Sequence, residues 1–413
     1  MSKIHSVRAR EIIDSRGMPT VEATIVLHGG YRGTASVPSG ASTGAFEAHE
    51  LRDNGDRYFG KGVLTAVNNV NKVIAPKIVG CKNCSLRHID KKLLSIDGTA
   101  NKSSLGANAT LAVSLALAHA NARECGQPLY RYIGGIFASK MPIPMMNILN
   151  GGAHASNNID IQEFMIVPHG FNTFSEALRA GCEIYKKLKD LLFQKGYSTS
   201  VGDEGGFAPN LENEYQAIEL IMEAIKESGY DTNQVKIALD IASSEWLKDD
   251  NKYHLPKAKA VYTTDELIKK WVSLVDKYPI ISIEDPLGET DYDGWTRLTS
   301  LLNNKVMLVG DDLFVTNTKR LEMGFERKMG NAILVKPNQI GTLSETLDVI
   351  IKAKSHSYAT IISHRSGETD DTSIADIAVA TNAGFIKTGA PCRMDRVCKY
   401  NRLLRIEEEI YRC

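Results

Sequence analysis

The amino-acid sequence predicts an α/β protein in which an eight-stranded β/α barrel follows a small α+β domain. The chain has 413 residues, which exceeds the size of one ordinary domain, so two domains are expected. After Lys140, short apolar runs alternate with amphipathic helical patterns, which is typical of a parallel sheet covered by helices. Eight such runs in about 270 residues fit a closed barrel. We therefore expect an N-terminal domain over residues 1–136 and a barrel over residues 137–413.

The first part of the chain has the pattern of a small sheet followed by helices. Alternate apolar residues from Val21 to Leu27 predict a strand, Gly29 and Gly30 a turn, and Tyr31–Val37 a second strand. The loop Pro38–Gly44 consists mainly of small residues and is predicted to be mobile. Helical spacing of apolar residues predicts helices over 60–78 and 105–123.

The predicted barrel strands are short apolar runs bounded by turn residues. They are Pro144–Leu149, Ile161–Val167, Val235–Leu239, Ile280–Ile283, Val306–Val309, Ala332–Val335, Thr360–Ile362 and Phe385–Ile386. Amphipathic spacing predicts helices between the later strands, over 263–277, 316–325 and 342–355. The sequence contains no glycine-rich dinucleotide fingerprint and no P-loop, so a nucleotide-binding fold is not expected.

The composition is that of an ordinary globular protein. Hydrophobic residues make up 43% of the chain and charged residues 24%. Lys plus Arg and Asp plus Glu both number 49, so the formal net charge is zero. A nucleic-acid or membrane-surface partner would require a basic excess, and no apolar run reaches membrane-spanning length. We therefore expect neither nucleic-acid binding nor a membrane span.

The cysteines and the N-terminus predict a cytoplasmic protein. Seven scattered cysteines in a long chain suit a reducing compartment better than a disulfide framework. The N-terminal segment M-S-K-I-H-S-V-R-A-R lacks the apolar core of a signal peptide. Cys81 and Cys84 form a single C-x-x-C, and because no second pair lies nearby we expect a surface loop rather than a zinc site.

Polar or charged residues occur near the ends of most of the predicted barrel strands. The carboxyl ends of barrel strands converge on one mouth, where active sites lie. We therefore expect the following residues to form an active site: Glu163, Asp240, Glu284, Asp311, Lys336, Ser363, His364, Arg365, Ser366 and Lys387.

Asp240, Glu284 and Asp311 place three carboxylates on successive predicted strands. Without a cation they would repel one another and raise one another's pKa values. Oxygen ligands without Cys or His favour Mg²⁺, or Mn²⁺, over Zn²⁺. A single Asp at a strand end more often caps a helix, but three such residues in register favour a metal site.

Lys336 ends the buried run Ala332–Val335, where removing an ammonium from water is costly. A divalent cation and Lys387 nearby would lower its pKa, and a neutral lysine can act as a general base. The alternative role is a salt bridge to one of the acids, and both roles can coexist. Arg365 and Ser366 offer a guanidinium fork and a hydroxyl group, which suit a phosphate.

Two glycine-bounded loops carry further candidate residues. His154 lies in N-G-G-A-H-A-S-N-N over residues 150–158, and Asp203 and Glu204 lie in V-G-D-E-G-G-F-A-P-N over residues 201–210. Acids flanked by glycines can approach a ligand closely, or they can cap the helix that begins near Glu212. Composition does not decide between these two interpretations.

Together these motifs resemble the enolase family, the phosphopyruvate hydratases of glycolysis, along nearly the whole chain. The matching segments are D-S-R-G-x-P-T-V-E from Asp14, P-S-G-A-S-T-G from Pro38, D-G-T-x-N-K-S from Asp97, M-N-I-L-N-G-G from Met146, Q-E-F-M from Gln162, V-G-D-E-G-G-F-A-P-N from Val201, S-I-E-D from Ser282, G-D-D-L-F-V-T-N from Gly310, L-V-K-P-N-Q-I-G-T-L from Leu334, S-H-R-S-G-E-T from Ser363 and I-K-T-G from Ile386. Departures from the family pattern occur at Met18, Ile241, Pro337 and Met394.

The resemblance implies reversible dehydration of 2-phosphoglycerate to phosphoenolpyruvate, with two Mg²⁺ ions per active site. Lys336 would remove the C2 proton, Glu204 would protonate the departing C3 hydroxyl, and Glu163 would be its partner acid. The implied metal ligands are Asp240, Glu284 and Asp311 for one ion, with Ser42 of the Pro38–Gly44 loop for the other. The further implied substrate contacts are His154, Arg365 and Ser366 at the phosphate, Ser363 and His364 lining the site, Lys387 at the carboxylate, and the metal ligands Glu284 and Asp311.

The resemblance also implies a cytoplasmic homodimer or octamer. Arg10 and Glu22 would pair with Glu408 and Arg405 across the interface, although such pairs could equally be solvated. The sequence also has two alternative interpretations. Another lyase of the same superfamily would keep the carboxylates but lose S-H-R-S and D-E-G-G. A non-catalytic binding protein, at the cell surface or in an assembly, is often marked in relatives by a C-terminal lysine, which this chain lacks.

Overall fold

The computed structural model describes residues 2–41, 44–81 and 85–411. The predicted metal ligand Ser42 and Cys84 of the C-x-x-C lie outside this range. The chain divides into two compact units. Unit 1 comprises residues 1–140, 335–352 and 362–383, and unit 2 comprises residues 141–334, 353–361 and 384–413.

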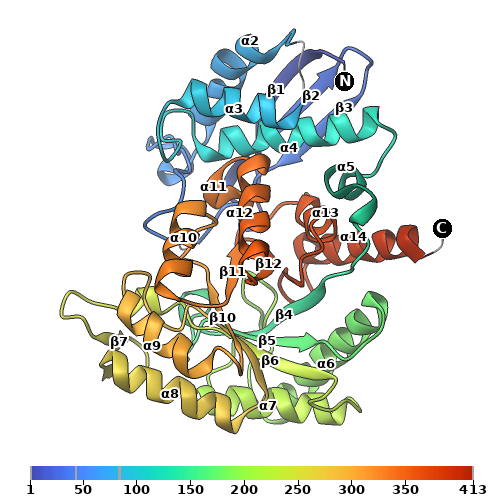
Figure 1. Ribbon diagram of the computed structural model, residues 1–413. Helices are drawn as coiled ribbons and strands as arrows, with labels where there is room; N and C mark the ends of the chain where they lie inside the picture. The colour runs from blue at the N-terminus through green and yellow to red at the C-terminus, as the bar shows by residue number, and fades with distance from the viewer. Residues whose placement is uncertain (1, 42–43, 82–84, 412–413) are drawn as a thin grey trace. The chain divides into compact units, whose positions relative to one another are not determined.

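Unit 1 contains a three-stranded antiparallel sheet covered by a long helix (Figure 1). The strands are β1 (Ile4–Ile13), β2 (Pro19–Leu27) and β3 (Arg32–Ser36), in the order β1-β2-β3. The helix α4 (Ala107–Glu124) packs against β2 and β3. Gly33 allows this close approach, because a Cβ at that position would collide with the backbone of Ala116 and Ala120 in α4. The two predicted strands are confirmed as β2 and β3, whereas β1 was missed.

The predicted helix over 60–78 is interrupted. The chain forms α1 (Leu64–Asn68), a π-helical turn η2 (Asn69–Ile74) and α2 (Ala75–Ile78). Pro76 lies in the first turn of α2. A proline has no N–H to donate and its ring crowds the carbonyl four residues earlier, so regular α-helical bonding cannot continue through it. The other helices that begin in unit 1 are η1 (Arg57–Gly60), α3 (Leu86–Asp97), α5 (Leu129–Gly134), η3 (Gly135–Phe137), α11 (Pro337–Ile340), α12 (Leu343–Ser355) and α13 (Ser373–Ala380).

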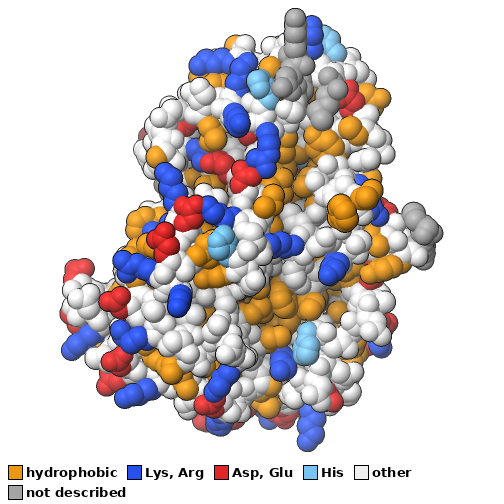
Figure 2. Space-filling view, viewed as in Figure 1, with side chains coloured by type: hydrophobic (Ala, Val, Ile, Leu, Met, Phe, Trp, Pro, Cys, Tyr) orange, Lys and Arg blue, Asp and Glu red, His pale blue; other side chains and the backbone are white. Residues whose placement is uncertain are grey.

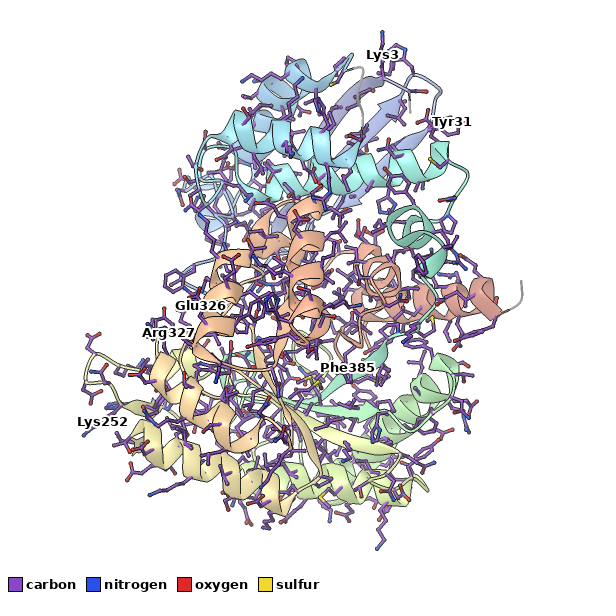
Figure 3. The ribbon with its side chains drawn as sticks, viewed as in Figure 1. Lys3, Tyr31, Lys252, Glu326, Arg327 and Phe385 are labelled. Carbon is purple, nitrogen blue, oxygen red and sulfur yellow. The ribbon has the colours of Figure 1, made fainter. Side chains whose placement is uncertain are left out.

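Eight strands close into a barrel, as the sequence predicts. They are β4 (Ile143–Asn150), β5 (Glu163–Pro168), β6 (Val235–Asp240), β9 (Ile280–Glu284), β10 (Met307–Gly310), β11 (Ala332–Val335), β12 (Ala359–Ser363) and β13 (Phe385–Lys387). Their order around the barrel is β10-β11-β12-β13-β4-β5-β6-β9. A cluster of buried side chains from these strands, including Met165, Val309 and Leu334, fills the interior, and Phe385 packs against it (Figure 3).

The expectation that the whole sheet is parallel is wrong at β5. This strand pairs antiparallel with both β4 and β6. A parallel pair needs a crossover connection, usually a helix, but the link from β4 to β5 contains only the short 3-10 turn η4 (Gly152–His154). Glu163 is therefore the first residue of β5 rather than a residue near its end. Because the strand is reversed, its beginning lies at the edge where the neighbouring strands end.

The helices of unit 2 lie outside the barrel strands (Figure 1). They are α6 (Phe174–Gln194), α7 (Glu214–Glu227), α8 (Thr264–Lys277), α9 (Tyr292–Leu302), α10 (Thr318–Arg327) and α14 (Met394–Tyr411), together with η5 (Ser243–Glu245). The hairpin β7 (Tyr253–Leu255) and β8 (Ala260–Tyr262) follows Lys252 (Figure 3). Thr263 starts α8 with a capping box, and Asn317 caps α10. These caps explain why both helices begin close to the predicted positions.

The surface carries mixed charge. On the face shown in Figure 2, basic and acidic side chains are interspersed rather than gathered into a region of one sign, which agrees with the zero net charge. In the part of the chain that the structure describes, no helix is both long and apolar enough to cross a membrane.

Candidate active site

Three acidic residues lie side by side across neighbouring strands at one edge of the barrel. Glu163 of β5 is opposite Asp240, the last residue of β6. Asp240 is in turn opposite Glu284, the last residue of β9. Each side chain is almost entirely buried. The strand register therefore brings together acids that are far apart in the sequence.

Lys387, the last residue of β13, provides the positive charge for this group. Its Nζ lies 2.9 Å from Asp240 Oδ2, 2.9 Å from both carboxylate oxygens of Glu284, and 3.3 Å from Glu163 Oε2. Burial alone would lower the pKa of Lys387, but the carboxylates of Asp240, Glu163 and Glu284 outweigh it and raise the pKa well above its usual value. Lys387 is thus a permanently charged, buried cation.

His154 joins Glu163 to a second acid, Glu204. Its Nδ1 lies 3.4 Å from Glu163 Oε1 and 3.7 Å from Glu204 Oε1. Burial alone would lower the pKa of His154, but the charges of Glu204 and Glu163 outweigh this effect and raise the pKa to about 9. Burial and the charge of Glu204 raise the pKa of Glu163 to about 7, against the opposing effects of Lys387 and His154. The group therefore contains a histidine that is cationic at neutral pH and a carboxyl group that titrates near it.

The loop that carries Glu204 is held by backbone hydrogen bonds. The Gly202 N–H donates to Gly206 O at 2.9 Å, and the Ala390 N–H donates to Glu204 O at 2.9 Å. The side chain of Asn147 donates to Glu204 Oε2 at 3.1 Å. The alternative interpretation, that this loop caps the next helix, is wrong, because α7 begins at Glu214 and is capped by the side chain of Asn213.

A second group of acids lies at the ends of β9 and β10. The carboxylate of Asp285 accepts hydrogen bonds from the N–H groups of Asp311 at 3.0 Å and Asp312 at 2.8 Å. Burial, followed by the charges of Asp312 and Asp311, raises the pKa of Asp285 well above its usual value. Carboxylate oxygens of these three residues lie within 4.8 Å of one another, as do ligand atoms of His154, Glu163 and Glu204. Both groups have the ligand types to hold a cation.

The three predicted acidic metal ligands therefore belong to two different groups of side chains, which the sequence did not indicate. Asp240 and Glu284 are bonded to Lys387, whereas Asp311 groups with Asp285 and Asp312. The donors of the acidic group are all oxygen atoms, which fits Mg²⁺ better than Zn²⁺. Burial is the main cause of the raised pKa of Asp285, and the neighbouring charges of Asp312 and Asp311, which a bound cation would offset, add to it.

Lys336 directly follows β11 and is the residue that precedes α11. Its backbone is extended, with φ −118° and ψ 106°. Pro337 explains this conformation, because a proline disfavours the helical region for the residue before it and is itself well suited to the first helical position. The strand therefore ends at Val335, Lys336 stays extended, and the helix begins at once.

Ser363 is the last residue of β12, and His364, Arg365 and Ser366 follow it in unit 1; all four are buried. The Arg365 N–H donates to Glu368 Oε1 at 3.1 Å, and Arg365 Nη1 lies 2.8 Å from Glu47 Oε2. Next to them, Ser39 and Gly367 exchange backbone hydrogen bonds of 2.8 and 2.9 Å. These contacts give the S-H-R-S segment a fixed backbone within its own unit.

Sequence reasoning assigned no role to four residues that this geometry makes important: Asp285, Asp312, Asn147 and Glu47. The doubled acids after β9 and β10 were a visible signal, because each predicted ligand, Glu284 or Asp311, is followed by a second acid. Asn147 and Glu47 gave no such signal, since each acts by contacting a residue distant in sequence.

Comparison with protein families agrees with these observations. Residues 4–133 match the enolase N-terminal domain, and residues 138–412 match the enolase C-terminal TIM barrel domain. Proteins of this family are lyases that act on small molecules and use Mg²⁺. The two matched domains cover nearly the whole sequence, and the chain belongs to the enolase family.

Proposed function

We propose that this protein catalyses the reversible dehydration of 2-phosphoglycerate to phosphoenolpyruvate and water. The observation that carries the proposal is the buried group of His154, Glu163 and Glu204 beside Lys387. It combines a carboxyl group that titrates near neutral pH with a permanent cation, and dehydration of a hydroxy acid needs both. The pair of carboxyl groups, Glu163 and Glu204, supplies a general acid, and the cation binds the substrate carboxylate.

The acid half of the reaction is assigned to Glu204, with Glu163 as its partner. Two buried carboxyl groups that repel each other retain a proton near neutral pH, and the cationic His154 stabilises whichever of them is ionised. A protonated Glu204 can give its proton to the C3 hydroxyl, which then leaves as water. In the reverse direction the same carboxylate accepts a proton from water, as microscopic reversibility requires.

The base half is assigned to Lys336. A neutral Lys336 would take the proton from C2, and the electron pair of the broken C–H bond would pass to the substrate carboxylate. Loss of the C3 hydroxyl then uses that electron pair to form the C2–C3 double bond. Support for this role comes from the position of Lys336 at the end of a barrel strand and from the extended backbone that Pro337 imposes on it.

Asp240, Glu284 and Asp311 are proposed to hold one Mg²⁺ ion, and Ser42 to help hold a second. When bound, Mg²⁺ supplies positive charge against the second negative charge that develops on the substrate carboxylate, and a Lys base with Mg²⁺ is the general pattern in enolase-superfamily sites. Lys387 contributes further positive charge to the same carboxylate. We assign the phosphate to His154, Arg365 and Ser366, with Ser363 and His364 lining the site.

We also propose that the protein works in the cytoplasm as a homodimer or a larger oligomer. Five described cysteines, Cys81, Cys125, Cys182, Cys392 and Cys398, are free thiols, which suits a reducing compartment. Arg10 and Glu22 face each other on β1 and β2 and form an ion pair of 3.4 Å within the chain. Arg10 remains half exposed, so it can still reach a second subunit.

The proposed function is tested by measuring phosphoenolpyruvate formation from 2-phosphoglycerate. We expect turnover with Mg²⁺, loss of turnover when a chelator removes the metal, and recovery when Mg²⁺ is restored. The Lys336→Ala variant should be inactive under all three conditions. A wild-type protein that shows no Mg²⁺-dependent turnover would refute the proposed function. Full activity of Lys336→Ala would overturn the assignment of the base.

A further inference from the structure

We propose that Glu47 is a positioning residue that orients the guanidinium of Arg365 for phosphate binding, an inference that rests on the proposed function. Glu47 lies in the N-terminal part of unit 1, more than three hundred residues before Arg365 in the sequence. Nothing in the local sequence around either residue indicates that they meet. The contact is a property of the folded unit.

The two side chains form a bidentate, buried ion pair. Arg365 Nη1 donates to Glu47 Oε2 at 2.8 Å, and Nη2 donates to Glu47 Oε1 at 3.2 Å. The side chains of Arg365 and Glu47 are only 3% and 9% exposed. Two parallel N–H···O bonds fix the plane of a guanidinium as well as its position. Exposed ion pairs are weak and mobile, but this one is shielded from water and therefore restrains Arg365 strongly.

Glu47 is itself held in place by neighbouring groups. Its Oε1 accepts hydrogen bonds from the Gly44 N–H at 3.0 Å and from Gln339 Nε2 at 3.3 Å. Its backbone N–H donates to Gly44 O at 3.1 Å. The carboxylate thus links the end of the Pro38–Gly44 loop to the guanidinium of Arg365.

The α11 segment supports the pair from a second direction. Arg365 Nη1 also donates to Asn338 Oδ1 at 3.3 Å, and the Ala48 N–H donates to Gln339 O at 2.8 Å. Asn338 and Gln339 are the second and third residues after Lys336. Two residues that support the pair, Asn338 and Gln339, are therefore on the short helix α11 that follows the proposed base. A phosphate-binding arginine held in this way loses little conformational freedom when substrate binds.

The test compares the variants Glu47→Gln and Glu47→Ala with wild type in the full-length, Mg²⁺-loaded protein. Glu50→Gln is the matched control, because Glu50 lies three residues away and also pairs with an arginine, Arg52, at 2.7 Å. Steady-state kinetics with 2-phosphoglycerate give KM and kcat separately. Binding of 2-phosphoglycerate is also measured by calorimetry, and thermal denaturation reports folding.

We expect Glu47→Gln to raise the KM and Kd for 2-phosphoglycerate by about tenfold, the effect of losing one charge-assisted hydrogen bond, while kcat changes less. Glu47→Ala should raise both constants further, and Glu50→Gln should change them by less than about twofold. Hydrogen exchange at the Gly44 amide should become faster in both Glu47 variants, because its acceptor is weakened or lost.

Two results overturn the proposal. If both Glu47 variants fold and keep the wild-type KM and Kd, Glu47 does not position Arg365 for substrate. If the Glu47 variants lower the melting temperature but change KM and kcat no more than Glu50→Gln does, the role of the pair is structural. A wild-type protein that neither binds nor converts 2-phosphoglycerate is a different result, because it overturns the proposed function and the phosphate role of the pair together.

Discussion

The ammonium of Lys387 is the counter-charge for three buried carboxylates, those of Asp240, Glu284 and Glu163. Removing one partner of a buried ion group leaves the other charges uncompensated, at a cost of several kcal/mol. The arrangement cannot be explained by stability alone, because apolar side chains of similar size would be at least as stable there. It is better explained by a need for concentrated charge in a ligand-binding site.

We predict that Lys387→Met destabilises the protein by about 3–5 kcal/mol in metal-free buffer, because Asp240, Glu284 and Glu163 lose their shared cation. Urea denaturation followed by circular dichroism measures this change. Lys186→Met is the control, since Lys186 is mostly exposed and pairs with Asp190 on the surface of α6, and it should change stability by less than about 1 kcal/mol. Equal effects of the two substitutions would contradict the account of Lys387.

His154 should make the stability of the protein depend on pH. Its pKa is raised from the usual 6.5 to about 9, so its protonation stabilises the folded state fully below about pH 6.5. That contribution is lost as the pH rises from about 6.5 through 9, because over this range the folded state keeps a proton that the unfolded state has already released. Glu163 acts in the same direction at lower pH: its raised folded-state pKa means that stability falls as the pH rises from about 4.5 to 7.

We therefore predict that the stability difference between wild type and His154→Gln is larger at pH 6 than at pH 9.5, by about 3 kcal/mol. Denaturant titrations at a series of pH values, without metal, give the difference directly. A difference that is constant over this range, or that grows with pH, would show that His154 is not held as a cation by Glu163 and Glu204.

At the scale of elements, the sequence predicts the barrel strands well and their directions less well. Each strand is a short apolar run bounded by turn residues, a pattern that depends only on neighbouring residues. The reversed direction of β5 depends instead on how β4 connects to it. The apolar pattern of a strand does not indicate whether the strand runs parallel or antiparallel to its neighbours. The apolar spacing predicted a helix over 105–123, but not that this helix, α4, is buried almost all round because it packs on the sheet and on other helices.

The candidate site likewise combines residues that a local sequence pattern identifies with residues that only long-range contacts identify. Residues at strand ends, such as Asp240, Glu284 and Lys387, could be identified because their positions follow from the strands themselves. Asn147 and Glu47 could not be assigned, since their importance comes from contacts made only in the folded chain. The same limit explains why the grouping of Asp311 with Asp285 and Asp312 was not foreseen.

Pro337 connects an element boundary to the proposed chemistry. It holds Lys336 in an extended conformation between β11 and α11. We predict that Pro337→Ala lowers kcat by about tenfold with a smaller change in KM, because a misplaced base slows proton transfer more than it weakens binding. Its stability should fall by no more than about 1 kcal/mol. Kinetics with 2-phosphoglycerate test this, and an unchanged kcat would show that Pro337 does not set the position of Lys336.

At the scale of the whole molecule, a balanced total charge coexists with strong local charge. The chain has equal numbers of acidic and basic residues, and its surface charges are interspersed on the face shown in Figure 2. Inside, by contrast, Asp285, Asp311 and Asp312 gather negative charge at one edge of the barrel. Self-repulsion in such a group opposes folding unless a cation is bound.

We predict that Mg²⁺ stabilises the protein against heat. At a free concentration of 100 times the dissociation constant, one bound ion adds about 2.7 kcal/mol to the free energy of unfolding. Differential scanning calorimetry with Mg²⁺ and with a chelator measures the shift. Asp311→Asn should reduce it strongly, whereas Asp190→Asn on the exposed face of α6 should not. A melting temperature that does not respond to Mg²⁺ in wild type would contradict the proposed metal site that includes Asp311.

The central claim is that Lys336 and Glu204 act on opposite steps of one elimination, and isotope exchange at C2 tests it most directly. The protein is incubated with 2-phosphoglycerate and Mg²⁺ in D₂O, and deuterium at C2 is followed by NMR together with phosphoenolpyruvate formation. We predict that Glu204→Gln still exchanges the C2 proton but forms almost no phosphoenolpyruvate, whereas Lys336→Ala does neither. Exchange at the wild-type rate in Lys336→Ala, or loss of exchange in Glu204→Gln together with normal dehydration, would contradict the account.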